Sequence, residues 1–111
     1  MTNPTTQEYH RMTLHELRNQ AISDLFTAKH RCLDHAVNAR QCIALQAFPE
    51  AGREIRCSDE WDSRVHEIMQ EMHRLGIGNI GSHILGTFAS DLGGIIADCE
   101  RLKAEMGVEN V

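Results

Sequence analysis

The chain has few features that identify a class of protein outright, beginning with its cysteines. Four cysteines occur among 111 residues, but no two form a C-x-x-C pair, so we interpret all four as reduced thiols rather than as a disulfide framework. No apolar run approaches the roughly 20 residues of a membrane span, and the polar start MTNPTTQEYHRM is not typical of a signal peptide. The sequence therefore predicts a cytoplasmic protein with no membrane contact.

Aromatic side chains and basic charge are also scarce. One tryptophan, one tyrosine and three phenylalanines give no stacking platform for single-stranded nucleic acid. The net charge is −5, and it is uneven: residues 1–56 balance at +1 and residues 57–111 at −6. Because non-specific nucleic-acid binding needs a dense basic face, we expect no direct nucleic-acid partner.

Motifs of catalysis and metal binding are missing as well. No nucleophile with a neighbouring base, no paired carboxylates and no phosphate-binding loop can be recognised, so we expect a non-enzymatic protein without a cofactor. Seven histidines suggest metal binding, yet neither H-x-x-x-H nor H-E-x-x-H occurs. Cys32 and His35 are the one weak candidate pair, which makes a metal-binding helical bundle the least favoured alternative.

A long first helix is indicated after a polar arm. Residues 1–12 are polar and aperiodic, and we expect them to be flexible. Thr13, with Glu16 three residues later, has the pattern of a capping box. No glycine or proline occurs between Thr13 and Pro49, and Pro49 is expected to end a helix of residues 14–48.

The apolar residues of this helix fall into two rows about 100° apart. The first row is rich in alanine, so a neighbouring backbone can approach it closely, and the second has larger side chains. A helix with two apolar rows is expected to contact two neighbours. The first row consists of Leu14, Leu17, Ala21, Leu25, Ala28, Cys32, Ala36, Ala39 and Ile43, and the second of Ile22, Phe26, Leu33, Val37 and Ala44.

A second helix is predicted after an irregular stretch, FPEAGREIRCSDEW, which contains proline and glycine breakers. Ser58 is expected to cap a helix of residues 59–75, and Gly76 is expected to end it. A heptad row of apolar residues gives this helix its buried face. The row consists of Trp61, Val65, Ile68, Met72 and Leu75.

A third helix, residues 83–106, is predicted after the hinge GIGNIGS, with Asn79 or Ser82 as its cap. Small residues form a flank along this helix. The helix contains three glycines, each of which lowers helix stability by about 1 kcal/mol relative to alanine. Close approach of another helix would offset that cost, and the alanine-rich row of the first helix is the expected mate. The flank consists of Gly86, Ser90, Gly93, Ala97 and Ala104.

Together these elements predict an all-α fold. A single helical domain of residues 13–107 is followed by a tail of residues 108–111, and its long N-terminal helix packs with a shorter helical hairpin. Because the first helix exceeds the third by roughly ten residues, or about 15 Å, part of its apolar surface lacks a partner within the chain. We therefore expect the three-helix arrangement to be completed by homodimerisation.

Three basic residues, Arg18, Lys29 and Arg40, recur every eleven residues along the strip between the two apolar rows. Their stems can cover apolar surface while the charges reach water or acidic neighbours. Alternatively, they form the basic floor of an interhelical groove in a helical oligomer, which would bind or sequester a small anionic ligand such as a nucleotide. The space for that ligand would come from Gly86, Ser90 and Gly93.

The leading functional hypothesis is a small acidic interaction protein that acts as a regulator, adaptor or inhibitor by binding a larger protein of unknown identity. Surplus apolar helix surface and the polarised charge favour it. Acidic residues of the second helix are the candidate contacts to a basic partner, although such residues commonly form a solvated face. These candidates are Asp59, Glu60, Asp62, Glu67 and Glu71.

Overall fold

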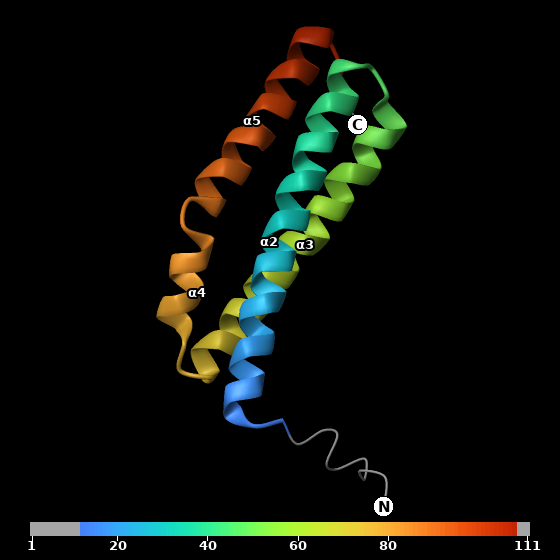
Figure 1. Cartoon of the computed structure of the whole chain (residues 1–111). Coiled ribbons are helices and arrows are strands. Elements are labelled where there is room, and N and C mark those ends of the chain that lie inside the picture. Colours follow the sequence, from blue (N-terminus) through green and yellow to red (C-terminus); the bar gives the residue numbers. More distant parts are fainter. Residues whose placement is uncertain (1–11, 109–111) are drawn as a thin grey trace, which may run out of the picture.

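The computed structural model describes residues 12–108, and this part of the chain is all-α. Its helices are α2 (Leu14–Ala44), α3 (Phe48–Arg74), α4 (Gly78–Leu85) and α5 (Phe88–Met106). Helices α2 and α3 form an antiparallel hairpin, and α4 and α5 make a broken third arm that runs back along α2 (Figure 1). Apart from Met12, the predicted flexible arm lies outside the described residues, as does the tail from residue 109 onward.

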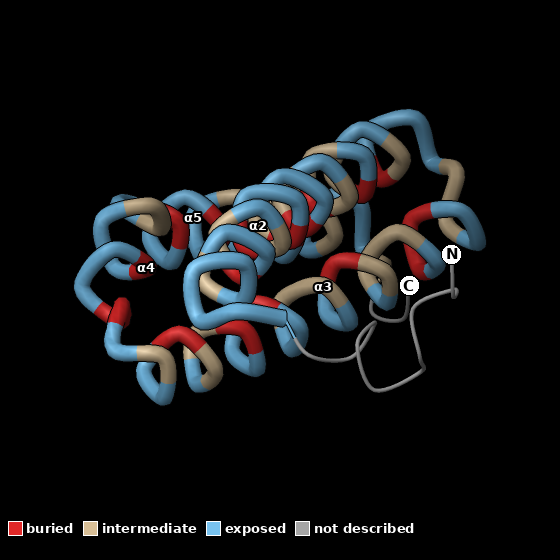
Figure 2. Tube along the Cα trace, turned by 60° about the horizontal axis from the view of Figure 1, so that its bottom comes forward, coloured by how far each residue is buried: buried red, intermediate tan, exposed pale blue. Residues whose placement is uncertain are grey.

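The start of α2 and its first apolar row are confirmed. The Thr13 hydroxyl accepts the Glu16 N–H at 3.1 Å, and the Glu16 carboxylate accepts the Thr13 N–H at 3.5 Å, which completes the capping box. Leu14 and Leu17 at the beginning of the row are exposed, whereas every later member is buried. The buried positions lie on the sides of the helices that face one another (Figure 2). On α2 they are Ala21, Leu25, Ala28, Cys32, Ala36, Ala39 and Ile43.

The boundary between the first two helices differs from the prediction. Helix α2 ends at Ala44 instead of residue 48, and the stretch predicted to be irregular forms the first part of α3. Pro49 lies in the first turn of α3, where its missing N–H costs no hydrogen bond, so it helps to begin a helix rather than to end one. Ser58 is not a cap but a buried residue in the middle of α3.

The predicted third helix is two helices. Asn79 and Ser82, expected in a hinge, lie within α4, which begins at Gly78. The chain breaks instead at Gly86, whose φ of 50° and ψ of −116° strongly favour glycine. Gly76, by contrast, ends α3 as predicted: its φ is 77°, and the N–H of Ile77 donates to the carbonyl of Met72 at 2.9 Å.

Helix α2 is the centre of the fold. It packs against α3 and α5, α4 contacts both α3 and α2, and α3 and α5 make few direct contacts with each other. The apolar row predicted on α3 supplies Val65, Ile68 and Met72 to the core. Helices α4 and α5 together nearly match α2 in length, so the difference in length expected between the first and third helices is absent. Leu14, Leu17 and Phe26 of α2 are nevertheless exposed, so part of its apolar surface does lack a partner within the described residues, and the dimer stays a prediction. No helix within residues 12–108 is both long and apolar enough to cross a membrane.

Candidate functional site

An apolar groove of about 340 Å³ lies between α3 and the third arm, where the two diverge. Val65, Phe88 and Leu92 are buried and form part of the core beneath it. Ile96 also lines the groove, and 43% of its surface is exposed. The remaining lining residues are Asp62, His66, Met69, Leu85, Ala89 and Gly93.

The groove exists because α3 and α5 both pack against α2 and make few contacts with each other. In a four-helix bundle, apolar side chains of all four helices meet in one core. Here three helical arms surround a partial core, and the apolar side chains between α3 and α5 have no fourth helix over them within the described chain. The groove therefore has the position and the lining of an incomplete helix-packing site.

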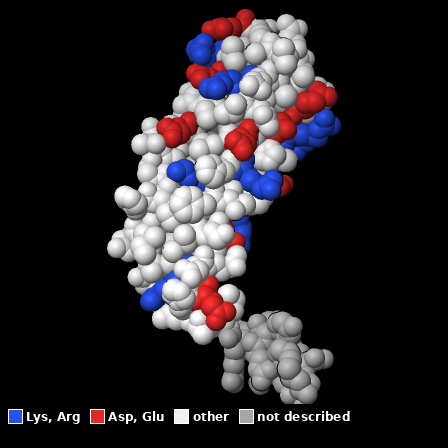
Figure 3. Space-filling model, viewed as in Figure 1, with Lys and Arg blue, Asp and Glu red and all other residues white. Residues whose placement is uncertain are grey.

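The groove has little charge. Its one acidic side chain is Asp62. His66 lies one helical turn away, with its Nδ1 3.7 Å from Asp62 Oδ1, and this Nδ1 also donates to the Asp62 carbonyl oxygen at 2.8 Å. Residues 75–97, which include α4 and the first half of α5, contain a single charged side chain, Asp91. In Figure 3 the surface over α4 shows almost no Lys, Arg, Asp or Glu. A surface depleted of charge is typical of the centre of a protein interface.

The small flank of α5 does not pack as the sequence predicted. Gly93 and Gly94 are exposed, and a Cβ added at either position would contact no neighbouring atom within 4 Å. The alanine-rich row of α2 is buried beneath other residues of α3 and α5, so it is not the mate of this flank. The cost of about 1 kcal/mol for each helical glycine is therefore not offset by close packing within the described chain.

The three predicted cations join α2 to three different elements. Arg18 Nε donates to the Leu75 carbonyl at the end of α3 at 2.9 Å, and Lys29 Nζ donates to the Ile84 carbonyl in the last turn of α4 at 2.9 Å. Both carbonyls lie at helix C-termini, where a cation is favourable. None of the three cations lines the groove, and of the small residues proposed to accommodate an anionic ligand, only Gly93 does.

The third cation, Arg40, pairs with Asp98 of α5 at 3.0 Å. Hydrogen bonds from Arg101 and Arg40 hold the pKa of the Asp98 carboxyl below its ordinary value of 3.8. Because each cation of the row contacts another helix, their arrangement is accounted for by packing between α2 and its neighbours.

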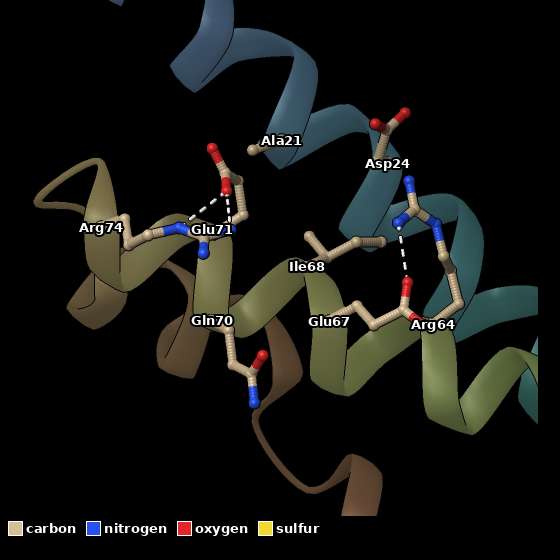
Figure 4. Close-up of a pocket in the computed structure, with 8 residues that line it drawn as sticks. All are labelled: Ala21, Asp24, Arg64, Glu67, Ile68, Gln70, Glu71 and Arg74. Carbon is tan, nitrogen blue, oxygen red and sulfur yellow. Dashed lines mark hydrogen bonds and ion pairs between the residues drawn. The ribbon is translucent and has the colours of Figure 1, made fainter.

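The acidic candidates on α3 do not form one continuous site. Asp59 and Glu60 are exposed, whereas Asp62 borders the groove. Glu67 and Glu71 lie by a second pocket of about 410 Å³, between α3 and α2. Figure 4 shows that most side chains lining this pocket are polar or charged, beside Ala21 and Ile68, and that its two arginines are paired with glutamates of the same helix. These pairs are Arg64 with Glu67 and Arg74 with Glu71.

The weak metal candidates point to different partners. Cys32 is fully buried and its Sγ donates to the Ser58 carbonyl at 3.3 Å, while His35 Nδ1 pairs with Glu54. Burial raises the pKa of the Cys32 thiol, and that of Cys99 in the same way. Among residues 12–108, no three His, Cys, Asp or Glu side chains converge in a geometry that could hold a metal ion.

Of the apolar residues at the groove, the sequence identified Val65 as a core position through its heptad row, and it indicated no groove beside that row. One signal was present: Ile95 and Ile96 are adjacent, and consecutive helical residues point about 100° apart. They cannot both face α2, so one of them had to face another surface.

No protein-family model, no curated protein and no solved structure matches this chain.

Proposed function

We propose that this protein is a small non-enzymatic interaction protein, acting in the cytoplasm as a regulator, adaptor or inhibitor by binding other polypeptides through its helix surfaces. The observation that supports this most is the groove between α3 and α5. It is apolar and nearly uncharged, and it lies where a further helix would complete a bundle. Helix-in-groove binding is a recurrent mode of peptide recognition, in which the apolar face of one helix is buried between two others.

The contact to a larger partner is proposed to include the acidic side of α3. Asp59 and Glu60 are exposed and lie about one and a half helical turns before Val65, which lines the groove. A basic surface on the partner would be steered toward them, and the effect would weaken as salt screens the charges. Converting both residues to lysine is expected to reduce capture of the partner without affecting the fold, because neither side chain is buried.

The function is tested by affinity capture from the native host with three forms of the tagged chain. The unmodified chain is expected to retain a polypeptide other than itself. Ile96→Glu, which places a charge in the groove, is expected to lose it. Phe26→Glu is the matched control, because Phe26 is a similarly exposed apolar residue on α2 that does not line the groove. Capture of no other polypeptide, or equal capture by all three forms, would contradict the proposal.

A further inference from the structure

We infer that the α3–α5 groove is a self-association surface, and that its occupant is α5 of a second copy of this chain. This inference rests on the proposed function, since it names one of the polypeptides that the groove binds. Three features of the described residues and one of the sequence support this inference.

The first feature is the glycine at the groove. Gly93 and Gly94 lie in the middle of α5, and neither has a neighbouring atom within 4 Å of an added Cβ. Only Gly93 lines the groove. A glycine on a helix surface allows another backbone to come close, and among residues 12–108 no helix does so. A second helix lying across the groove would use the space that Gly93 leaves.

The second feature is that the groove and the side chain that fits it lie on the same helix. Ile96, exposed over 43% of its surface, lies one turn after Gly93. The small residue Ala89 lies one turn before Gly93. If two α5 helices cross antiparallel about a two-fold axis near Gly93, Ile96 of each copy lies opposite the partner's Ala89 and the partner's Ser90. Both copies then bury a large apolar side chain against small residues at once, and the same patch of each copy meets, as in an isologous interface.

The third feature is charge. The chain has a net charge of −5, so two copies that met through acidic surfaces would repel each other. The groove offers one carboxylate, Asp62, with His66 beside it. Asp91, the single charged residue among positions 75–97, is not in its lining, and its carboxylate accepts the Thr87 hydroxyl at 2.8 Å. Two copies can therefore meet here with little like-charge repulsion.

The fourth feature is the composition of the chain's own N-terminal segment, which is the other candidate to occupy the groove. Residues 1–11, MTNPTTQEYHR, have no apolar row at helical spacing and contain a proline. Such a segment cannot cover Met69, Leu85 and Ile96, which are half-buried or exposed apolar residues of the groove, with an apolar face, whereas α5 of a second copy can.

Matched variants at the two adjacent glycines test the inference. Sedimentation velocity of the purified full chain, over a range of micromolar concentrations, is expected to give a mass of twice the 12.5 kDa of one chain. Gly93→Glu is expected to halve that mass, because it places bulk and charge at the two-fold axis. Gly94→Glu is expected to leave it unchanged. Glutamate favours helix more than glycine does, so both variants are expected to fold, which circular dichroism verifies.

Two results would overturn the inference. If the unmodified chain is a monomer at every concentration, the groove does not bind a second copy, and only the helix of a different protein can be its occupant. If Gly93→Glu and Gly94→Glu both remain dimeric, the copies associate through another surface. Neither result bears on capture of a different polypeptide from the host, so the failure of this inference and the failure of the proposed function are distinguishable.

Discussion

Ser58 and Cys32 exchange hydrogen bonds where α3 crosses α2. The Ser58 hydroxyl donates to the Cys32 carbonyl oxygen at 3.0 Å, and the Cys32 thiol donates to the Ser58 carbonyl oxygen at 3.3 Å. Both residues are buried, and both are small enough for the two backbones to come close. The sequence placed Cys32 in an apolar row and Ser58 at the start of a helix. Only the crossing of the two helices made them partners.

Removing the Ser58 hydroxyl is expected to weaken this crossing. Ser58→Ala should lower the free energy of unfolding by about 1 kcal/mol, because a buried hydrogen bond is lost with little change in volume. Urea denaturation monitored by circular dichroism measures the effect. Ser63→Ala, at an exposed position of the same helix, is the control and should leave the midpoint nearly unchanged. Equal midpoints for the two variants would show that the Ser58 hydroxyl does not stabilise the fold.

The contact of Lys29 with α4 leads to a local prediction. Its ammonium donates to the Ile84 carbonyl at 2.9 Å, near the break between α4 and α5. Lys29→Met keeps the apolar stem and removes the donor. The free energy of opening α4 is therefore expected to fall by about 1–2 kcal/mol, and hydrogen exchange at its amides should become faster. His30→Ala, at the exposed neighbouring position, should not change exchange in α4. Unchanged protection of α4 in Lys29→Met would contradict a structural role for this cation.

Asp98 gives the stability of the α2–α5 contact a dependence on pH. Its pKa is lowered in the folded protein by Arg101 and Arg40, so its contribution is present above its ordinary value of 3.8 and is lost as the pH falls through the lower folded value. Asp98→Asn lacks this contribution at every pH. The difference in Tm between the unmodified chain and Asp98→Asn should therefore be largest near neutral pH and shrink as the pH falls below 3.8. A difference that stays constant down to acid pH would contradict this account.

Gln46 is a position at which a substitution should stabilise the protein. It follows the end of α2 with a φ of 61°, in the same left-handed conformation that Gly76 and Gly107 adopt after their helices. Residues with a Cβ adopt this conformation at a cost, so Gln46→Gly is expected to raise the free energy of unfolding by about 1 kcal/mol. Thermal unfolding measures the shift, and Gln41→Gly, inside α2, should shift Tm in the opposite direction.

Local chemistry alone decided several features of this fold. The capping box at Thr13 needs only residues within one helical turn, and the positive φ of Gly76 needs only the absence of a Cβ. The buried row of α2 followed from its spacing, because apolar side chains that recur on one side of a helix must be removed from water together. For these features the sequence was sufficient.

Tertiary packing decided what local signals left ambiguous. Pro49 is compatible with the end of one helix or the first turn of the next, and Gly86 with a helix interior or a break. The packing of the helices against α2 decided between these alternatives at both positions. The same packing gave Arg18, Lys29 and Arg40 their three different contacts. The groove depends on the same cause, because α3 and α5 each pack on α2, and the space between them is set by helix crossings that no single helix encodes.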